Sequence, residues 1–204
     1  MTETKIIDPS SCKLGVMPIP LPVVLVSYKD NNESGANLTT VSYAGQVSSG
    51  QVYVSLRPTR NGYGRIKDEG FFGMNYVYPA QAYVMDADYC GLVSGRDVDK
   101  FLATGLTKEI VDDIPLVGES PLSLTCSLKE VIKMDSHDIF IGQVLSIIQR
   151  AQSSSIRGDF ILSALMHMGF QYFPISNNEY MARGRVMEVG KELKPYRGVK
   201  NDTR

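Results

Sequence analysis

The segments LSLTCSLKEVI (residues 122–132) and DIFIGQVLSII (residues 138–148) are the longest strand candidates in the chain. Their β-branched and apolar residues favour strands because such side chains pack well on a pleated surface. The polar stretch Lys133–His137 between them has the length of a hairpin connection. The two segments therefore predict a long β-hairpin, and the rest of the chain can be read outward from it.

Shorter strands are predicted upstream of this hairpin, at Val23–Tyr28, Asn37–Tyr43, Gln51–Leu56 and Phe71–Val77, with a turn over Asp30–Gly35. Helical spacing and stop signals predict helices at Tyr63–Glu69, ended by Gly70, at Ala80–Cys90, at Asp97–Ala103, ended by Gly105, and at Asp159–Met168. Strands outnumber helices, and the helices do not alternate regularly with them. This pattern favours a mainly β antiparallel barrel with helical insertions over a doubly wound parallel sheet.

Composition limits the classes of protein to consider. The 204 residues fit a single domain, with a core over 12–182 and a polar tail over 183–204. Lys plus Arg is 21 and Asp plus Glu is 22, so no net charge favours nucleic acid. No apolar run is long enough to span a membrane, and the N-terminus lacks signal-peptide features, so a cytoplasmic protein is expected. Three widely spaced cysteines predict buried thiols, with neither a disulfide framework nor a metal site.

Common nucleotide-binding motifs are missing. Gly62-Tyr-Gly64 begins like the glycine-rich loop of dinucleotide-binding folds, but Lys67 stands where the third glycine belongs. The chain has no P-loop and no GxSxG nucleophile motif. Function must therefore be sought in polar groups beside the strands.

Two polar segments stand out. Asn37–Tyr43 offers the hydroxyls of Thr39 and Ser42, which suit the edge of a planar polar ring, although threonine is also ordinary on a β surface. Ser55–Arg60 places two arginines and two hydroxyls on a proline-stiffened turn directly after a strand. That set suits a phosphate, and a solvated basic loop is the alternative.

Two further points carry charge. Ser94 and Asp97 resemble a weak capping box, and Arg96, Asp99 and Lys100 form either a salt-bridged helix face or, through Lys100, an anion contact. His137 precedes a strand, where a structural hydrogen bond is a more common role for histidine than catalysis.

Several stretches, taken in this order, match one known family. They are Pro22–Val26, Asn37–Tyr43, Val54–Pro58, Asp88–Gly91, SGRDVDKF (94–101), Thr104–Leu106 and HDIFIG (137–142). Together they resemble the flavin reductase-like FMN-binding split-barrel proteins, including the flavoredoxin branch. The resemblance implies a six-stranded antiparallel Greek-key barrel, a split β-barrel that dimerises and binds FMN near the subunit interface.

The resemblance also implies cofactor-binding positions, which are Asn37, Leu38, Thr39, Thr40, Tyr43, Ser55, Leu56, Arg57, Thr59, Arg60, Lys100, His137 and Tyr172. Asn37 and Thr39 would lie at the flavin ring, and Tyr43 stands where the family often has Trp. Ser55, Arg57 and Arg60 would hold the ribityl and phosphate end.

Two more roles follow from the same resemblance. Lys100 would add charge, His137 would border the flavin or nicotinamide pocket as a catalytic residue, and Phe170 or Tyr172 would close the site. One departure is plain, because Asn61-Gly62 stands where the family usually has a bulky residue and then Thr or Ser. Thr59 is a possible substitute for that hydroxyl.

The resemblance implies an FMN-dependent oxidoreductase that takes electrons from NAD(P)H or from a reduced partner. Two alternatives stay open. One is a flavoredoxin-like electron carrier that does not use a nicotinamide and exchanges electrons with a redox protein or free flavin. The other is a split-barrel binding module that has lost its flavin. A homodimer is expected, since a shallow groove on one barrel would leave FMN half exposed.

Overall fold

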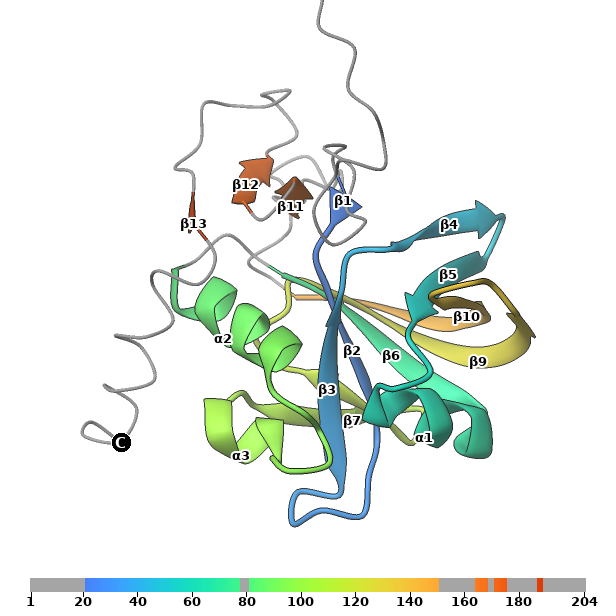
Figure 1. Ribbon diagram of the computed structural model, residues 1–204, viewed down its shortest axis with the longest axis horizontal. Helices are drawn as coiled ribbons and strands as arrows, with labels where there is room; N and C mark the ends of the chain where they lie inside the picture. The colour runs from blue at the N-terminus through green and yellow to red at the C-terminus, as the bar shows by residue number, and fades with distance from the viewer. Residues whose placement is uncertain (1–20, 78–80, 151–163, 169–170, 176–186, 189–204) are drawn as a thin grey trace, which may run out of the picture.

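A curved antiparallel sheet forms the body of the protein (Figure 1). The computed structural model describes residues 21–77, 81–150, 164–168, 171–175 and 187–188. The sheet has seven strands in the order β3-β2-β6-β9-β10-β5-β4. Their bounds are β2 (Val24–Lys29), β3 (Ala36–Val41), β4 (Ala44–Ser48), β5 (Gln51–Leu56), β6 (Phe71–Tyr76), β9 (Leu122–Ile132) and β10 (Asp138–Gln149). Edge strands β3 and β4 do not pair with each other, so the barrel is split.

Three helices and two small sheets complete the described part of the chain. The helices are α1 (Asn61–Glu69), α2 (Gln81–Leu92) and α3 (Lys100–Thr104). One small sheet has the order β1 (Leu21–Pro22), β11 (Ala164–Met168), β12 (Gln171–Ile175) and β13 (Met187–Glu188), and the other pairs β7 (Lys108–Val111) with β8 (Ile114–Val117). None of the helices described is long and apolar enough to cross a membrane.

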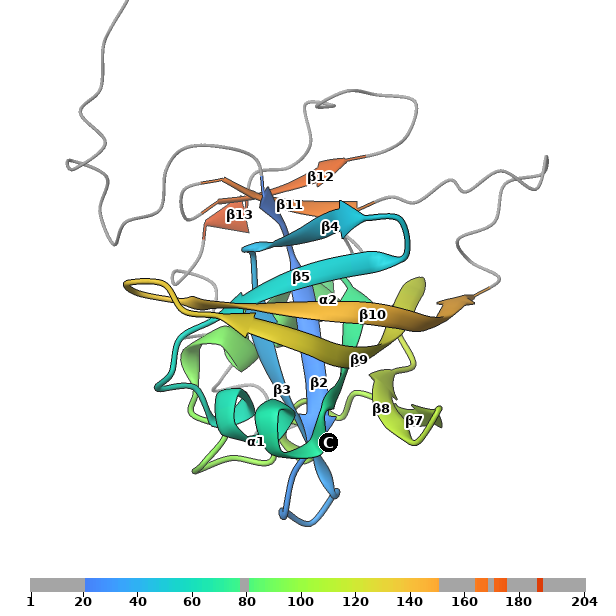
Figure 2. The ribbon, with the colours of Figure 1, turned by 90° about the vertical axis from the view of Figure 1, so that its right-hand side faces the viewer.

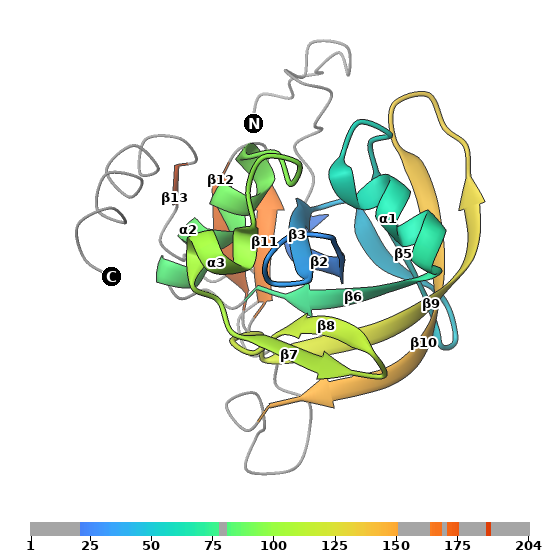
Figure 3. The same ribbon diagram turned by 90° about the horizontal axis from the view of Figure 1, so that it is seen from below.

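Strand β2 is buried on both faces and organises the core. Val24, Val26 and Tyr28 face the inside of the curved sheet, where they pack with residues of β5, β6, β10 and α1. Val23 and Leu25 alternate with them and belong to a second cluster, shared with α2 and α3. Figure 3 shows the consequence: α1 lies at the open side of the curved sheet, and α2 and α3 lie on its other side.

The central hairpin and the barrel class are confirmed. β9 and β10 pair antiparallel, with Ile139 opposite Ile132 and Gln149 opposite Leu122, and β5 lies between β10 and β4 (Figure 2). The described sheet has seven strands where the resemblance implied six. Left-handed glycines Gly70 and Gly105 end α1 and α3, as predicted.

Several local predictions need correction. The predicted helix Asp159–Met168 is wrong over Ala164–Met168, which form β11 between β1 and β12, and its first five residues lie outside the described chain. The N-cap of α3 is Asp99, whose side chain accepts from the Leu102 N–H, so the predicted capping box at Ser94 is wrong. Cys90 and Cys126 are buried thiols as predicted, and Cys12 lies outside the described residues.

Candidate functional site

One cavity, here called the main cavity, opens between the end of β3 and the end of β5. Its volume is about 300 Å³. Residues of three segments line it: Thr39–Tyr43, Ser55–Arg57 with Arg60, and His137. Eight of the predicted cofactor positions meet here, namely Thr39, Thr40, Tyr43, Ser55, Leu56, Arg57, Arg60 and His137. The structure therefore brings together the strand-end hydroxyls and the arginine turn, which are distant in the sequence.

The hydroxyl group of Thr39 is buried without a hydrogen-bond partner among the described residues. The residue is 2% exposed, and its Oγ1 has no hydrogen-bond partner among the described residues. Its neighbours are satisfied, because Thr40 donates to the Ala87 carbonyl and Ser55 donates to the Asp138 carbonyl at 3.3 Å. A buried polar atom without a partner costs free energy, and such atoms are rare in folded proteins. Thr39 thus provides one hydrogen-bonding group for a ligand in the main cavity.

His137 is held as a neutral side chain at the cavity wall. Arg57 Nε donates to His137 Nε2 at 3.0 Å, so the imidazole proton is on Nδ1, which lies 2.9 Å from Ser136 Oγ. Burial, and then the charges of Arg57 and Arg60, hold the pKa of His137 below its ordinary 6.5. The Tyr43 ring meets the imidazole edge-on, with 5.3 Å between ring centroids. These contacts fix the orientation of both rings.

The loop that carries His137 is anchored by the next residue. The Asp138 carboxylate accepts from Tyr63 Oη at 2.6 Å, from Lys133 Nζ at 2.8 Å and from the Met134 N–H at 3.1 Å. These three donors, led by Lys133, lower the pKa of Asp138 to about 2. Asp138 therefore stays ionised at neutral pH, and its hydrogen bonds to Lys133 and Met134 hold the loop between β9 and β10 in place.

A second cavity, here called the arginine pocket, adjoins the main cavity. Its volume is about 260 Å³, and Arg57 and Arg60 line both cavities. The other lining residues are Thr59, Asn61, Leu92, Ser94 and Arg96. Within the described chain, Arg57, Arg60 and Arg96 form no ion pair with a carboxylate. Desolvation and the neighbouring Arg57 lower the pKa of Arg60, as expected where cations gather without counter-ions. The pocket suits an anion.

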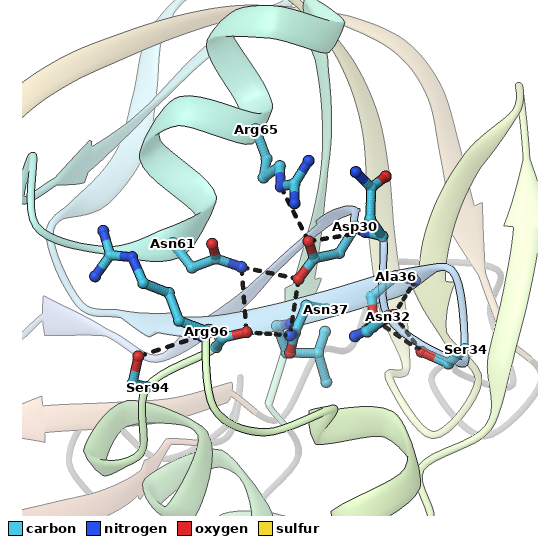
Figure 4. A network of polar contacts seen from close by, with 12 residues as sticks. Asp30, Asn32, Ser34, Ala36, Asn37, Asn61, Arg65, Ser94 and Arg96 are labelled. Carbon is cyan, nitrogen blue, oxygen red and sulfur yellow. Dashed lines mark hydrogen bonds and ion pairs between the residues drawn. The ribbon is translucent and has the colours of Figure 1, made fainter.

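A network of hydrogen bonds and one ion pair connects three segments of the chain beside the arginine pocket (Figure 4). Asp30 accepts from Asn61 Nδ2 at 2.8 Å and from Asn37 Nδ2 at 3.0 Å, and it pairs with Arg65 at 3.0 Å. Asn37 also donates to the carbonyls of Gly95 and Val98, each at 3.0 Å. The network joins the β2–β3 turn, the start of α1 and the loop before α3.

Some predicted site residues lie elsewhere. Asn37 is buried in the network just described, and Leu38 packs in the core beside α2 and α3. Lys100 is 1% exposed, its Nζ donates to the Cys90 carbonyl at 2.7 Å, and burial lowers its pKa to about 8. None of the three lines either cavity. Tyr172 lies in β12, but its side chain is outside the described part of the structure, as is Phe170.

The salt-bridged helix face considered for Arg96, Asp99 and Lys100 is not present. Asp99 accepts from the Ser34 N–H at 2.8 Å and caps α3, while Arg96 Nη1 donates to the Thr59 carbonyl at 2.9 Å. Arg96 and Ser94 line the arginine pocket but were not predicted as site residues, whereas Ser42 at the main cavity was considered for its hydroxyl. The available signal for Arg96 and Ser94 was their place in the SGRDVDKF segment (94–101).

Comparison with known proteins places this geometry in a family. The model of the flavin reductase like domain matches residues 16–176. Flavoredoxin of Desulfovibrio vulgaris (Miyazaki F) is 28% identical, with a TM-score of 0.71 over 81% of this chain and 91% of that one.

Two more distant structures share the fold. Flavoredoxin from Methanosarcina acetivorans is 24% identical, with a TM-score of 0.71 over 94% of this chain and 100% of that one. An FMN-binding protein from Thermus thermophilus is 19% identical, with a TM-score of 0.69 over 89% and 98%. No curated protein matches the chain. Since the family model covers most of the chain, the protein belongs to the flavin reductase-like family, whose function is flavin-related redox chemistry.

Proposed function

We propose that the protein binds FMN and acts as an oxidoreductase that passes electrons from NAD(P)H or a reduced partner through the flavin. The observation that carries the proposal is the buried Thr39 hydroxyl, which has no partner among the described residues, in a cavity adjoining arginines that pair with no carboxylate of the described chain. A flavin mononucleotide has the matching form, a planar ring with hydrogen-bonding edges joined by a polyol chain to a phosphate. The described residues therefore fit the cofactor at both ends.

Each residue of the site has a task in this proposal. Thr39 would supply a hydrogen bond to the ring edge, and Tyr43 and His137 would form one wall of the ring site. Arg57 and Arg60 would neutralise the phosphate through charge-assisted hydrogen bonds. The bound flavin supplies the redox chemistry, and the protein supplies orientation and electrostatics. His137 accepts a hydrogen bond from Arg57 as a neutral imidazole. It therefore orients Arg57 without neutralising its charge, which remains available to the phosphate.

We further propose that the protein is a homodimer. Leu145 and Ile147 on β10 are 48% and 63% exposed, and neighbouring exposed apolar side chains are typical of protein interaction surfaces. β10 begins directly after His137, which lines the main cavity. A second copy packed on the outer face of β10 would cover these two apolar side chains. Light scattering that shows a monomer with bound FMN would contradict this.

The experiment that tests the FMN site is a titration of flavin-free wild type, Arg57→Ala and Lys129→Ala. Lys129 is exposed on β9 and lines neither cavity, so its variant controls for the loss of one positive charge. Arg57→Ala is expected to raise the FMN dissociation constant about tenfold, which is the value of one charged hydrogen bond. Lys129→Ala is expected to bind as wild type does, and an unchanged Arg57→Ala titration would remove Arg57 from the site.

Anaerobic addition of NADH to the FMN complex then shows whether a nicotinamide or a reduced partner protein is the electron donor. Bleaching of the flavin absorbance supports a nicotinamide-driven reductase. A persistent flavin band moves the proposal to an electron carrier with a redox-protein partner. A wild type that does not bind FMN supports the module that has lost its flavin.

A further inference from the structure

The start of α1 has no room for a side chain at residue 62. A Cβ at Gly62 would lie 2.6 Å from Tyr28 Cε1 and 2.9 Å from Tyr28 Cδ1. Tyr28 is 1% exposed and packed in the core, so its ring has no free space into which to move. Any side chain at residue 62 would therefore have to displace this ring. The glycine allows the start of α1 to lie directly against Tyr28.

The same tyrosine reaches the loop that precedes α3. A Cβ at Gly95 would lie 2.8 Å from the Tyr28 hydroxyl and 3.2 Å from Asn61 Cβ. Tyr28 thus fits between two glycines, one at the start of α1 and one in this loop, and both backbones approach it closely. The close approach brings Arg96, the residue after Gly95, to the arginine pocket.

The backbone next to Arg96 is fixed on several sides. The Gly95 carbonyl accepts from Asn37 Nδ2 at 3.0 Å and from Asn61 Nδ2 at 3.3 Å, and the Val98 carbonyl accepts a further bond from Asn37 (Figure 4). The Arg96 N–H donates to Ser94 Oγ at 3.2 Å. A residue held in this way loses little entropy when a ligand binds.

The Arg96 guanidinium has N–H donors that are available for further hydrogen bonds. Nη1 donates to the Thr59 carbonyl at 2.9 Å, and no carboxylate of the described chain pairs with the guanidinium. A guanidinium carries several N–H donors in a planar fork that matches a phosphate. Arg96 therefore faces a cavity already lined by Arg57 and Arg60 and has donors left for an anion.

We infer that Arg96 is the third phosphate contact of the site and determines its specificity for the phosphorylated flavin. This inference rests on the proposed function, since it assigns the phosphate end of the same cofactor. Riboflavin has the same ring and polyol chain as FMN but no phosphate. Arg96 should therefore contribute to binding of FMN and contribute nothing to binding of riboflavin.

A purely structural role for Arg96 makes a different prediction. Its bond to the Thr59 carbonyl also fastens the Arg57–Arg60 turn to the loop before α3. If that were its whole contribution, removing it would loosen Arg57 and the main cavity, and both ligands would bind more weakly. The ratio of the FMN and riboflavin affinities separates the two roles.

The test is a titration of flavin-free wild type, Arg96→Ala, Arg96→Lys and Lys129→Ala with FMN and with riboflavin, followed by quenching of flavin fluorescence. Arg96→Ala is expected to lower the FMN-to-riboflavin affinity ratio about tenfold, with riboflavin binding unchanged. Arg96→Lys keeps the charge without the fork and should lower the ratio less. Lys129→Ala should leave the ratio as in wild type.

Four results would overturn the inference. Equal weakening of both ligands by Arg96→Ala would show that the residue acts only on the loops. No change in either affinity would show that Arg96 does not contact the cofactor. A wild type that binds riboflavin but gains nothing from the phosphate would remove the phosphate site while leaving the ring site intact. A wild type that binds neither ligand would overturn the proposed function as well.

Discussion

The two glycines inside α1 provide a matched pair of substitutions that tests the position of Tyr28. An alanine in a helix is more favourable than a glycine by about 0.5–1 kcal/mol. A Cβ at Gly64 meets nothing within 4 Å, so Gly64→Ala should stabilise the protein by about that amount. A Cβ at Gly62 would lie 2.6 Å from the buried Tyr28 ring. Overpacking of this kind costs about 1–3 kcal/mol, so Gly62→Ala should be less stable than wild type despite the better helix former.

Urea denaturation of the two variants measures this difference directly. The free energies of unfolding of the two variants should differ by the overpacking cost of about 1–3 kcal/mol, because the gain in helix propensity is common to both, with Gly64→Ala above wild type and Gly62→Ala below it. Because both changes are glycine to alanine in one helix, their effects on the unfolded chain are the same. Equal stabilisation by both would show that the Tyr28 ring does not occupy the space beside residue 62.

Two further predictions concern the main cavity. Thr39→Val should leave the free protein as stable as wild type or more so, because the hydroxyl has no partner, yet raise the FMN dissociation constant about tenfold; weaker folding with unchanged FMN binding would contradict this. By NMR, His137 should titrate below 6.5, and Arg57→Ala and bound FMN should each raise its pKa. Since the folded pKa is the lower one, its contribution to stability is full above pH 6.5 and declines as the pH falls through the folded pKa.

The sequence predicted the strands with the clearest alternation. Gln51–Leu56 and Leu122–Ile132 match β5 and β9 residue for residue. The β7–β8 hairpin was missed because its turn uses Asp112 and Asp113 at positive φ, without the glycine that usually marks such turns. β11 was missed because Ala, Leu and Met favour helices, and its pairing with β1 and β12 outweighs that preference.

The site was predicted in part, for reasons that lie in long-range packing. Thr39, Arg57 and His137 share one cavity because β3, β5 and β10 bring their ends together. Asn37 and Lys100 have the same polar character, yet the fold uses them for buried bonds to backbone carbonyls. Nothing in the residue types distinguishes these two uses, since both satisfy hydrogen bonds.

The measurement that tests the central claim most directly is equilibrium binding of FMN to the flavin-free wild type. The account predicts saturable binding that weakens as salt is added, because the guanidinium groups of the arginine pocket hold the phosphate by charge. It also predicts that the bound flavin gives the protein a visible absorption band. A protein that stays colourless and shows no saturable binding would contradict the claim, and the main cavity would then need a different ligand.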